Sequence, residues 1–412
     1  MPQLTRRLFH QYFGILALLF LLAGMVVSKA MMSMGMIGLA INWIINPEVG
    51  RYVRAWWRHP VLASLSIFFL ALFVTGLWSE DTAYWVNRMR MKLPFLLMPA
   101  ALLSIPRFDK QVYYPLLVFF MALVAAICVY LTGWYVWHFQ DTNQAYAEGR
   151  VLPTPVMHIR FSLMVAYAAA IGISLAIDDW QWKWKQERWV YASLAVFLVL
   201  FLHILAVRSG LVAVYGMLVY FVVRYIVIYR RWWIGVLAIA GLLTGGVLAY
   251  YTVPSLQKKV DYTLYNLYHI RNGNLDPNLS DTHRIGTIHA GIHLGNTHFW
   301  TGVGYGDIRE ETEQFLQQYY PDVSGFSYTP QSQVVLVYAV GGIGGLLIFV
   351  GMLVVQWFYR SGWKAPLLGS LLAVLIPSFL VEQTLETQLG NTLYLVFLLM
   401  AVRYYQHEGD RR

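Results

Sequence analysis

The chain has 412 residues, of which 58% are hydrophobic and only 12% are charged. Soluble globular proteins carry about 25% charged residues, so this composition argues against one large soluble core. The formal net charge of +9 does not indicate nucleic acid binding, because membrane topology explains the placement of the cations better. The single cysteine, Cys128, lies inside an apolar run and cannot form an intrachain disulfide.

Twelve apolar stretches predict transmembrane helices, since about 20 helical residues cross the hydrocarbon core of a bilayer. They lie near residues 12–28, 31–46, 61–78, 92–105, 112–133, 159–177, 189–207, 209–228, 233–252, 332–356, 366–381 and 389–404. The sequence therefore predicts an all-α integral membrane protein. Spans one to nine occupy residues 1–252, and spans ten to twelve with a cytoplasmic tail occupy residues 332–412.

The predicted orientation follows from Lys and Arg, which are enriched in cytoplasmic loops. With the N-terminus in the cytoplasm, cytoplasmic segments hold most of the cations, and the short outward loops hold only Lys29, Arg88, Arg90, Lys92, Arg150, Arg160 and Arg208. This asymmetry predicts a multi-pass protein of the bacterial inner membrane. Both termini are expected in the cytoplasm and the active face in the periplasm.

One connection differs from the others in length. Residues 253–331 form a polar stretch between spans nine and ten, on the predicted periplasmic side. Loops of this length inside a compact protein usually have a function. We expect short helices near 255–270 and 282–297, followed by a less regular piece through Pro321 and Pro330.

The cations on the outward side run against the positive-inside tendency. They are Arg88, Arg90 and Lys92 before span four, Arg208 at the junction of two spans, and Arg284 and Arg309 in the large loop. Cations at this interface make sense if they hold an anion, and the planar fork of arginine suits phosphate. The alternative is that their side chains extend to lipid headgroups.

The segment from Asp281 to Leu294 predicts a helix that is capped by Asp281 or Ser280. Arg284 lies at the edge of its apolar face. His289 and His293 have a spacing that could hold a metal, but no carboxylate motif accompanies them, so we expect solvated histidines and no metal site.

A glycine-rich turn follows, Trp300-Thr-Gly-Val-Gly-Tyr-Gly-Asp307. Its glycines allow a tight turn whose amides are exposed to an anion. Gly-rich turns are common, so the turn alone is weak evidence.

Taken together, these segments resemble the O-antigen ligase and O-antigen polymerase superfamily. The matching pieces, in chain order, are Trp78-Ser-Glu with Lys92-Leu-Pro-Phe-Leu-Leu-Met-Pro, His158-Ile-Arg-Phe-Ser, Arg208-Ser-Gly, Arg284, Thr301-Gly-Val-Gly-Tyr-Gly-Asp, Pro330-Gln-Ser-Gln and Val340-Gly-Gly-Ile-Gly-Gly. The resemblance covers most of the chain in order and topology.

The resemblance implies a glycosyltransferase that uses an undecaprenyl-pyrophosphate-linked glycan as donor. In ligases the acceptor is a lipid A–core sugar, and in polymerases it is another lipid-linked repeat. The two arginines that serve the pyrophosphate in ligases fall on Arg208 and Arg284. No cofactor or metal is implied, because the donor is already activated.

The sequence departs from the ligase pattern where the large loop ends. Gln331 and Ser332 stand where ligases usually show a His-Asn-like pair, and glutamine cannot act as a general base. His283 is one nominee for that role, and Asp281, Asp307, Glu310 and Glu311 are others. Arg88, Arg90, Lys92, Arg309, Gln331 and Ser332 are the expected substrate-binding residues.

Two alternatives to the ligase assignment remain open at this point. The first is a polymerase, which shares donor and fold. The second is a transporter of lipid-linked glycans, although transporters place ionisable groups near the bilayer midplane and the cations here lie at the outer interface. Glu382 and Glu386, at the outward end of span eleven, either bind sugar hydroxyls or belong to a simple polar loop.

Overall fold

The computed structural model describes residues 2–178, 180–271, 280–325 and 328–409. Every regular element in these ranges is helical, which confirms the all-α fold class. Up to the large loop the helices are α1 (Pro2–Val27), α2 (Lys29–Ile44), α3 (Val49–Arg58), α4 (Pro60–Val74), η1 (Thr75–Leu77), α5 (Thr82–Lys92), α6 (Pro94–Leu103), α7 (Lys110–Trp137), α8 (Phe139–Ala147), α9 (His158–Ile177), α10 (Glu187–Leu205), α11 (Arg208–Tyr229) and α12 (Trp232–Thr252). The remainder are α13 (Pro254–Arg271), α14 (Ser280–Thr297), α15 (Ile308–Tyr319), η2 (Pro321–Val323), α16 (Gln333–Phe358), η3 (Tyr359–Lys364), α17 (Pro366–Val381), η4 (Thr384–Glu386) and α18 (Gln388–Gly409).

A helix covers each of the twelve predicted spans, but not every one is long enough to cross a bilayer alone. In the described part of the chain, eight helices have the length and apolar composition of a span, or nine if the bent pair α2–α3 is one span. The bend between α2 and α3 is 108°. α6 has 10 residues and α17 has 16, so these two are shorter than the roughly 20 residues that a full crossing needs.

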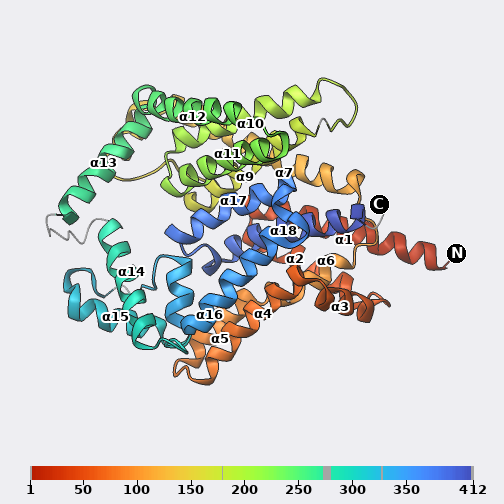
Figure 1. Ribbon diagram of the computed structural model, residues 1–412, viewed down its shortest axis with the longest axis horizontal. Coiled ribbons are helices and arrows are strands. Elements are labelled where there is room, and N and C mark those ends of the chain that lie inside the picture. Colours follow the sequence, from red (N-terminus) through yellow and green to blue (C-terminus); the bar gives the residue numbers. More distant parts are fainter. Residues whose placement is uncertain (1, 179, 272–279, 326–327, 410–412) are drawn as a thin grey trace.

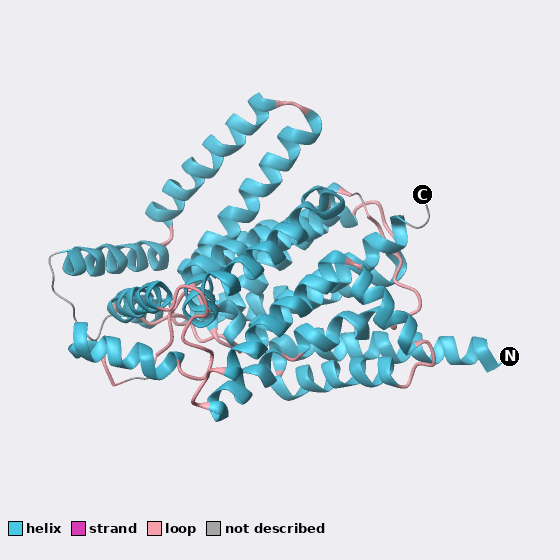
Figure 2. Cartoon of the chain, turned by 60° about the horizontal axis from the view of Figure 1, so that its bottom comes forward, coloured by secondary structure: helices cyan, strands magenta, loops and turns pink. Residues whose placement is uncertain are grey.

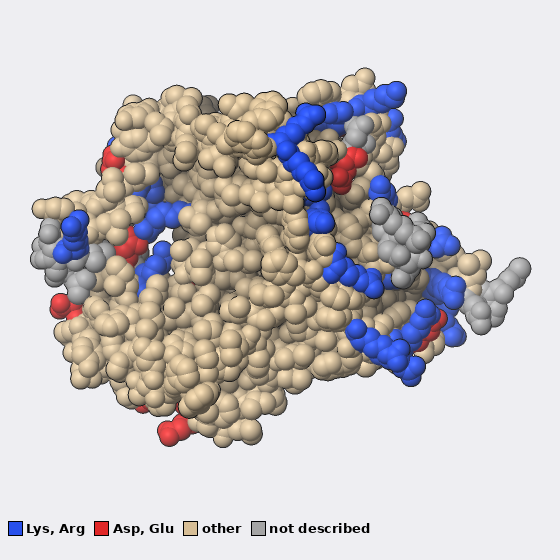
Figure 3. Space-filling model, in the orientation of Figure 1, with Lys and Arg blue, Asp and Glu red and all other residues tan. Residues whose placement is uncertain are grey.

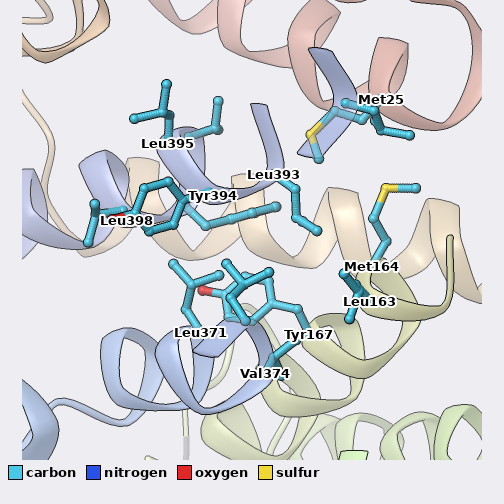
Figure 4. Close-up of a cluster of buried hydrophobic side chains, with 14 of the residues drawn as sticks. Met25, Leu163, Met164, Tyr167, Leu371, Val374, Leu393, Tyr394, Leu395 and Leu398 are labelled. Atoms are coloured by element: carbon cyan, nitrogen blue, oxygen red, sulfur yellow. The ribbon is translucent and has the colours of Figure 1, made fainter. Parts of the chain in front are cut away.

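The centre of the bundle is formed by α9, α17 and α18, with α1 beside them. Figure 4 shows side chains from all four helices in one buried cluster. Its labelled members are Met25, Leu163, Met164, Tyr167, Leu371, Val374, Leu393, Tyr394, Leu395 and Leu398. Over an 18-residue stretch of α9, 83% of the residues are buried, whereas the corresponding value in α12 is 6%. α9 is therefore a core helix and α12 a peripheral one, whose apolar surface is left for lipid.

The large loop lies at one end of the molecule. α13, α14 and α15 gather there, and both termini lie at the opposite end (Figures 1 and 2). On the face drawn in Figure 3, Lys and Arg side chains gather near the termini, and a smaller group of charges lies beside a hollow at the end that carries α13–α15. The loop is thus a helical cap on one end of the bundle.

The two helices expected in this loop are present, since α13 and α14 match the predicted ranges within two residues. A third helix, α15, occupies part of the segment that we expected to be less regular. Its buried side chains are Ile308, Thr312, Phe315 and Leu316, a spacing that places them on one face of a helix. The sequence contained this signal, and the expectation of irregular structure was wrong there.

Candidate functional site

Arg208 is the first residue of α11, directly after a sharp reversal of the chain. α10 ends at Ala206, which is buried and has left-handed backbone angles (φ 50°, ψ 32°). Such angles are costly for a residue with a Cβ, so packing must hold the turn in place. The reversal puts a guanidinium at a helix N-terminus, where the helix dipole already favours anions.

In the structure, the anion that pairs with Arg208 is the carboxylate of Asp281. Arg208 Nη1 donates to Asp281 Oδ2 at 2.9 Å, and Nη2 lies 2.7 Å from Oδ1, so the pair is bidentate. Asn266 donates to the same carboxylate at 3.2 Å. Burial raises the pKa of Asp281, but the hydrogen bond and charge of Arg208 outweigh it and hold the pKa below its ordinary value. Asp281 lies within the first turn of α14 and not before it, so this carboxylate serves the ion pair.

A pocket of about 140 Å³ opens beside Arg208. Its polar members are Arg208, Lys259 and Thr263, and its apolar members are Ala206, Leu211, Leu256, Val260 and Leu264. Burial and, as the second cause, the charge of Arg208 together lower the pKa of Lys259 to about 8. The Lys259 ammonium donates to the Gly149 carbonyl at 2.7 Å. Two cations over an apolar wall suit a phosphate that is attached to a hydrocarbon chain.

Arg284 lies one turn further along α14, close enough for its charge to lower the pKa of Asp281. Its Nη2 donates to Glu382 Oε1 across a short ion pair. Glycines on α14 let this helix pack closely on α16, because a Cβ at Gly291 would lie 2.6 Å from Val335 and one at Gly295 would lie 2.4 Å from Tyr338. The position of Arg284 is therefore set by tight helix packing.

Glu382 begins a connection between α17 and α18 on which several cations converge. We call residues 382–387 the 382–387 connection. Arg160, at the start of α9, donates to the Gln383 carbonyl at 2.9 Å and to Thr387 Oγ1 at 3.3 Å. Arg160 is 2% exposed. Within the part of the chain that the structure describes, neither Arg160 Nη1 nor Arg284 Nε has a hydrogen-bond partner, although both atoms are buried. Buried guanidinium nitrogens without partners are costly, and an anionic ligand would satisfy them.

At the other end of the 382–387 connection, Glu386 is buried and fully hydrogen-bonded within the protein. Both carboxylate oxygens of Glu386 accept hydrogen bonds: Oε1 from Lys92 at 2.7 Å and from Gln333 at 3.1 Å, and Oε2 from the Tyr305 hydroxyl. Lys92 also donates to the Leu385 carbonyl at 2.8 Å. Burial raises the pKa of Glu386, and the Lys92 charge and hydrogen bond reverse this, so the net direction is downward.

The three cations before span four, Arg88, Arg90 and Lys92, lie in different environments in the structure. Lys92 is buried in its pair with Glu386, which favours a structural role over the substrate contact expected from the sequence. Arg88 lies over the Tyr84 ring and donates weakly to the Glu386 carbonyl at 3.4 Å, and Arg309 lies over the same ring. Arg90 is exposed. The charges of Arg88 and Lys92 both act on Glu386, so these two cations are already paired within the protein, and Arg90 stands apart from them.

The glycine turn contradicts the expectation of amides that are open to an anion. The amides of Val303 and Gly304 donate to the Ala339 and Val340 carbonyls, that of Tyr305 to Thr75 Oγ1, and that of Gly306 to Ser79 Oγ. Gly302 and Gly304 have positive φ angles, and a Cβ at Gly304 would lie 2.6 Å from Ser79. The glycines are needed for close packing of the turn against α16 and against residues 75–81, which form η1 and the connection after it, and its amides are already used.

The nominated bases are mostly engaged in contacts that stabilise the fold. The Asp307 carboxylate accepts from the Glu80 and Asp81 amides, and the His283 ring packs against Tyr328. Glu310 is an exposed residue of α15 that contacts Gln314.

The expected substrate-binding residues Gln331 and Ser332 lie directly before α16. Ser332 donates to the Phe379 carbonyl at 3.3 Å, and Gln331 is half-buried.

The histidine pair of α14 makes aromatic contacts. His289 Nδ1 lies 2.8 Å from the Tyr320 hydroxyl, and the rings of His289 and His293 both pack against Phe315. Among the residues that the structure describes, no group of three or more His, Cys, Asp or Glu is placed to hold a metal ion.

Residues 193–350 match the family model described as O-antigen ligase. Over these residues the chain is similar to the O-antigen ligase family. The matched segment begins in α10 and ends in α16, so it contains Arg208, Asp281, Arg284 and the whole large loop, but not Arg160 or the 382–387 connection. No curated protein matches the chain.

Sequence reasoning found the two arginines but missed most of their surroundings. Arg160 was noticed as an outward cation and as part of a motif but was not assigned to the site, and Lys259, Tyr305 and Gln333 were not singled out. The partners of both arginines are distant in the chain, since Arg208 and Asp281 are 73 positions apart and Arg284 and Glu382 are 98 positions apart. A local pattern cannot reveal such pairs. The one available signal was the isolation of Arg208 and Arg160 at span ends, where an unpaired cation requires a partner.

Proposed function

We propose that this protein is a membrane glycosyltransferase of the O-antigen ligase type, which transfers a glycan from undecaprenyl pyrophosphate to a lipid A–core acceptor. The observation that carries the proposal is the convergence of Arg208 and Arg284 at the first turn of α14, inside the matched domain. We also propose that the protein lies in the bacterial inner membrane with both termini in the cytoplasm and α13–α15 in the periplasm.

In the proposed donor complex, the pyrophosphate replaces carboxylates as the partner of both arginines. The pocket beside Arg208 supports this, because Lys259 adds a second cation and the apolar wall of Leu211, Leu256 and Val260 fits the first isoprene units. The buried Nε of Arg284 gains a partner in the same exchange. Arginine–phosphate contacts are charge-assisted and bidentate, so they compensate for the broken ion pairs.

The reaction follows from this placement. An acceptor hydroxyl attacks the anomeric carbon of the glycan, and the bond from that carbon to the pyrophosphate oxygen breaks. Negative charge grows on the departing oxygen, so guanidinium groups that are already in place stabilise the transition state more than the ground state. The cations come from the protein, and the donor is already activated, so we propose that no metal or cofactor takes part.

A deletion strain tests the proposal through its glycolipids. Loss of polymer from the lipid A–core, with polymer accumulating on its lipid carrier, is the expected result. Lipid A–core that carries single repeats would instead identify a polymerase, which the Gln331-Ser332 departure from the ligase pattern also permits. Unchanged glycolipids would overturn both assignments. The same strain complemented with the wild-type gene controls for effects on neighbouring genes.

A further inference from the structure

The 382–387 connection carries two carboxylates that are four residues apart and differ in how they are used. Glu386 has both oxygens occupied by protein donors. The Glu382 carboxylate has a single hydrogen-bonded partner among the described residues, the guanidinium of Arg284, which uses Oε1. Its side chain is 10% exposed. Only one of these two carboxylates can therefore change partners without dismantling the connection.

Glu382 is held in place by its backbone and not by its carboxylate. The Glu382 carbonyl accepts from the Gln333 amide at 3.1 Å, and its amide donates to the Ser378 carbonyl at 2.8 Å. Arg160 lies near enough to interact with the Glu382 charge. The carboxylate thus stays at the site when Arg284 turns to another anion.

We infer that Glu382 is the proton acceptor of the transfer reaction and that binding of the donor releases it for this role. The inference rests on the proposed function. When the pyrophosphate takes Arg284, the buried carboxylate of Glu382 loses its hydrogen-bond donor. A buried carboxylate without a partner is costly, and an acceptor sugar hydroxyl supplies the missing O–H group. The exchange places the acceptor hydroxyl beside the donor only after the donor has bound.

The bond changes balance without any further reactant. The acceptor oxygen forms a bond to the anomeric carbon, and its proton moves to Glu382 as that bond forms. The bond between the anomeric carbon and the pyrophosphate oxygen breaks, and its electron pair leaves on the undecaprenyl pyrophosphate. When this product departs, Glu382 returns its proton to solvent or to the phosphate and again pairs with Arg284.

The other carboxylates near the site are less suited to the role. Asp281 is bound by Arg208 and Asn266 and its pKa lies below the ordinary value, which weakens it as a base. Asp307 holds two backbone amides of another loop. Glu382 also lies beside the start of α16, directly after the end of the large loop, since its carbonyl accepts from the Gln333 amide.

The test compares Glu382→Gln with the wild-type protein in lipid nanodiscs that contain the lipid-linked glycan donor and a lipid A–core acceptor. Glutamine keeps an oxygen for Arg284 but cannot take the proton. We expect undecaprenyl pyrophosphate to bind as tightly as to the wild type or more tightly, while the single-turnover rate at saturating donor falls about 10²–10⁴-fold. Glu382→Asp, which keeps a carboxylate, should recover part of the rate. Glu48→Gln, at a carboxylate that lies before α3, is 40% exposed and pairs with Arg51, is the matched control and should transfer at the wild-type rate.

The outcomes separate this inference from the proposed function. If wild-type protein transfers glycan and Glu382→Gln does so at a similar rate, Glu382 is not the proton acceptor. If Glu382→Gln loses donor binding and turnover together while remaining folded, the carboxylate only positions Arg284, and the inference fails in that way. If the wild type itself transfers nothing to the acceptor, the proposed function fails independently of any Glu382 variant.

Discussion

Two ion pairs meet on the 382–387 connection, and they differ in their access to solvent. In the Lys92–Glu386 pair, the side chains are 1% and 6% exposed. In the Arg284–Glu382 pair, they are 24% and 10% exposed, and the related Arg208–Asp281 pair has exposures of 35% and 8%. The pairs that involve arginine therefore combine an accessible cation with a buried carboxylate, whereas the lysine pair is closed on both sides.

This difference suits the Lys92–Glu386 pair to stabilising the fold and the two arginine pairs to the proposed function. A buried pair that loses one partner leaves an uncompensated charge, which costs about 3–5 kcal/mol, so Lys92 and Glu386 must stay together. The accessible arginines can meet an incoming anion while their carboxylates stay behind. In the proposed mechanism, the charged residues at the end of the bundle that carries α13–α15 serve two purposes, which the charge pattern of the sequence does not distinguish.

The largest effect is expected when the accessible arginines are changed. Arg208→Ala and Arg284→Ala should each lower glycan transfer by about 10²–10³-fold, the cost typical of removing one group that stabilises a developing oxyanion. Lysine keeps the charge but loses the planar fork, so Arg208→Lys and Arg284→Lys should remain strongly impaired. The measurement is initial transfer rate per folded protein in nanodiscs.

Folded protein must be quantified in this experiment, because both arginines link the large loop to the bundle. Arg208 pairs with Asp281 and Arg284 pairs with Glu382, so loss of either arginine can also affect folding. Arg271→Ala, at the end of α13, is the matched control and should have a mild effect. Near wild-type transfer by folded Arg208→Ala and Arg284→Ala proteins would place the pyrophosphate elsewhere.

The closed pair should give the opposite result. Lys92→Met or Glu386→Gln alone should destabilise the protein by about 3–5 kcal/mol, while the protein that stays folded keeps most of its transfer activity. The double variant should be more stable than either single variant, because no charge is left buried alone. Denaturation in detergent measures stability, and transfer per folded molecule measures function. A transfer rate that falls 100-fold with no change in stability would reverse the assignment of these two pairs.

The helices were largely predictable from the sequence, because apolar runs and interrupting polar residues are local signals. Every predicted span coincides with a helix. The number of crossings was less predictable, since α6 and α17 are short and α2 bends sharply into α3. Length and apolarity alone do not determine whether such helices cross fully or partly.

The site was predictable only in part. Arg208 and Arg284 stood out because outward cations are rare in membrane proteins. Their carboxylate partners, Asp281 and Glu382, did not stand out, because only the tertiary packing of α14 and of the 382–387 connection brings them to the arginines. The glycine turn was wrongly predicted as an anion site. Its residues suit such a site locally, but its amides already donate to the oxygens of Thr75, Ser79, Ala339 and Val340. The local sequence indicates which residues could bind a ligand, and tertiary packing determines which of their polar groups are free to do so.

A smaller effect is expected at Lys259, which shares the pocket with Arg208. Its pKa is lowered to about 8 by burial first and by Arg208 second. The charged form that attracts phosphate is therefore present below pH 8 and is lost as pH rises through that value. Donor affinity in the wild type should fall about fivefold between pH 7 and pH 9.5, a change of about 1 kcal/mol that is typical of one partly exposed charge.

Lys259→Arg, which stays charged throughout this range, should remove the pH dependence, and Lys259→Met should show the weaker affinity at every pH. Binding of undecaprenyl pyrophosphate to protein in nanodiscs provides the measurement. A wild-type affinity that is constant from pH 7 to pH 9.5, or a decline of equal size in Lys259→Arg, would remove Lys259 from the donor site.

The smallest effect is expected from chelation of divalent ions. In the proposed reaction, the charges that stabilise the departing pyrophosphate come from Arg208 and Arg284, so we expect transfer to be independent of a metal. His289 and His293 have the spacing of a ligand pair, but they face the aromatic rings of Phe315 and Tyr320. Transfer by protein in nanodiscs should therefore stay within about twofold of its initial rate in EDTA, a change of about 0.4 kcal/mol in the activation free energy. His289→Ala should also stay near the wild-type rate, with or without added magnesium. Activity that disappears in EDTA and returns with a divalent ion would show that a metal, and not arginine alone, stabilises the leaving group.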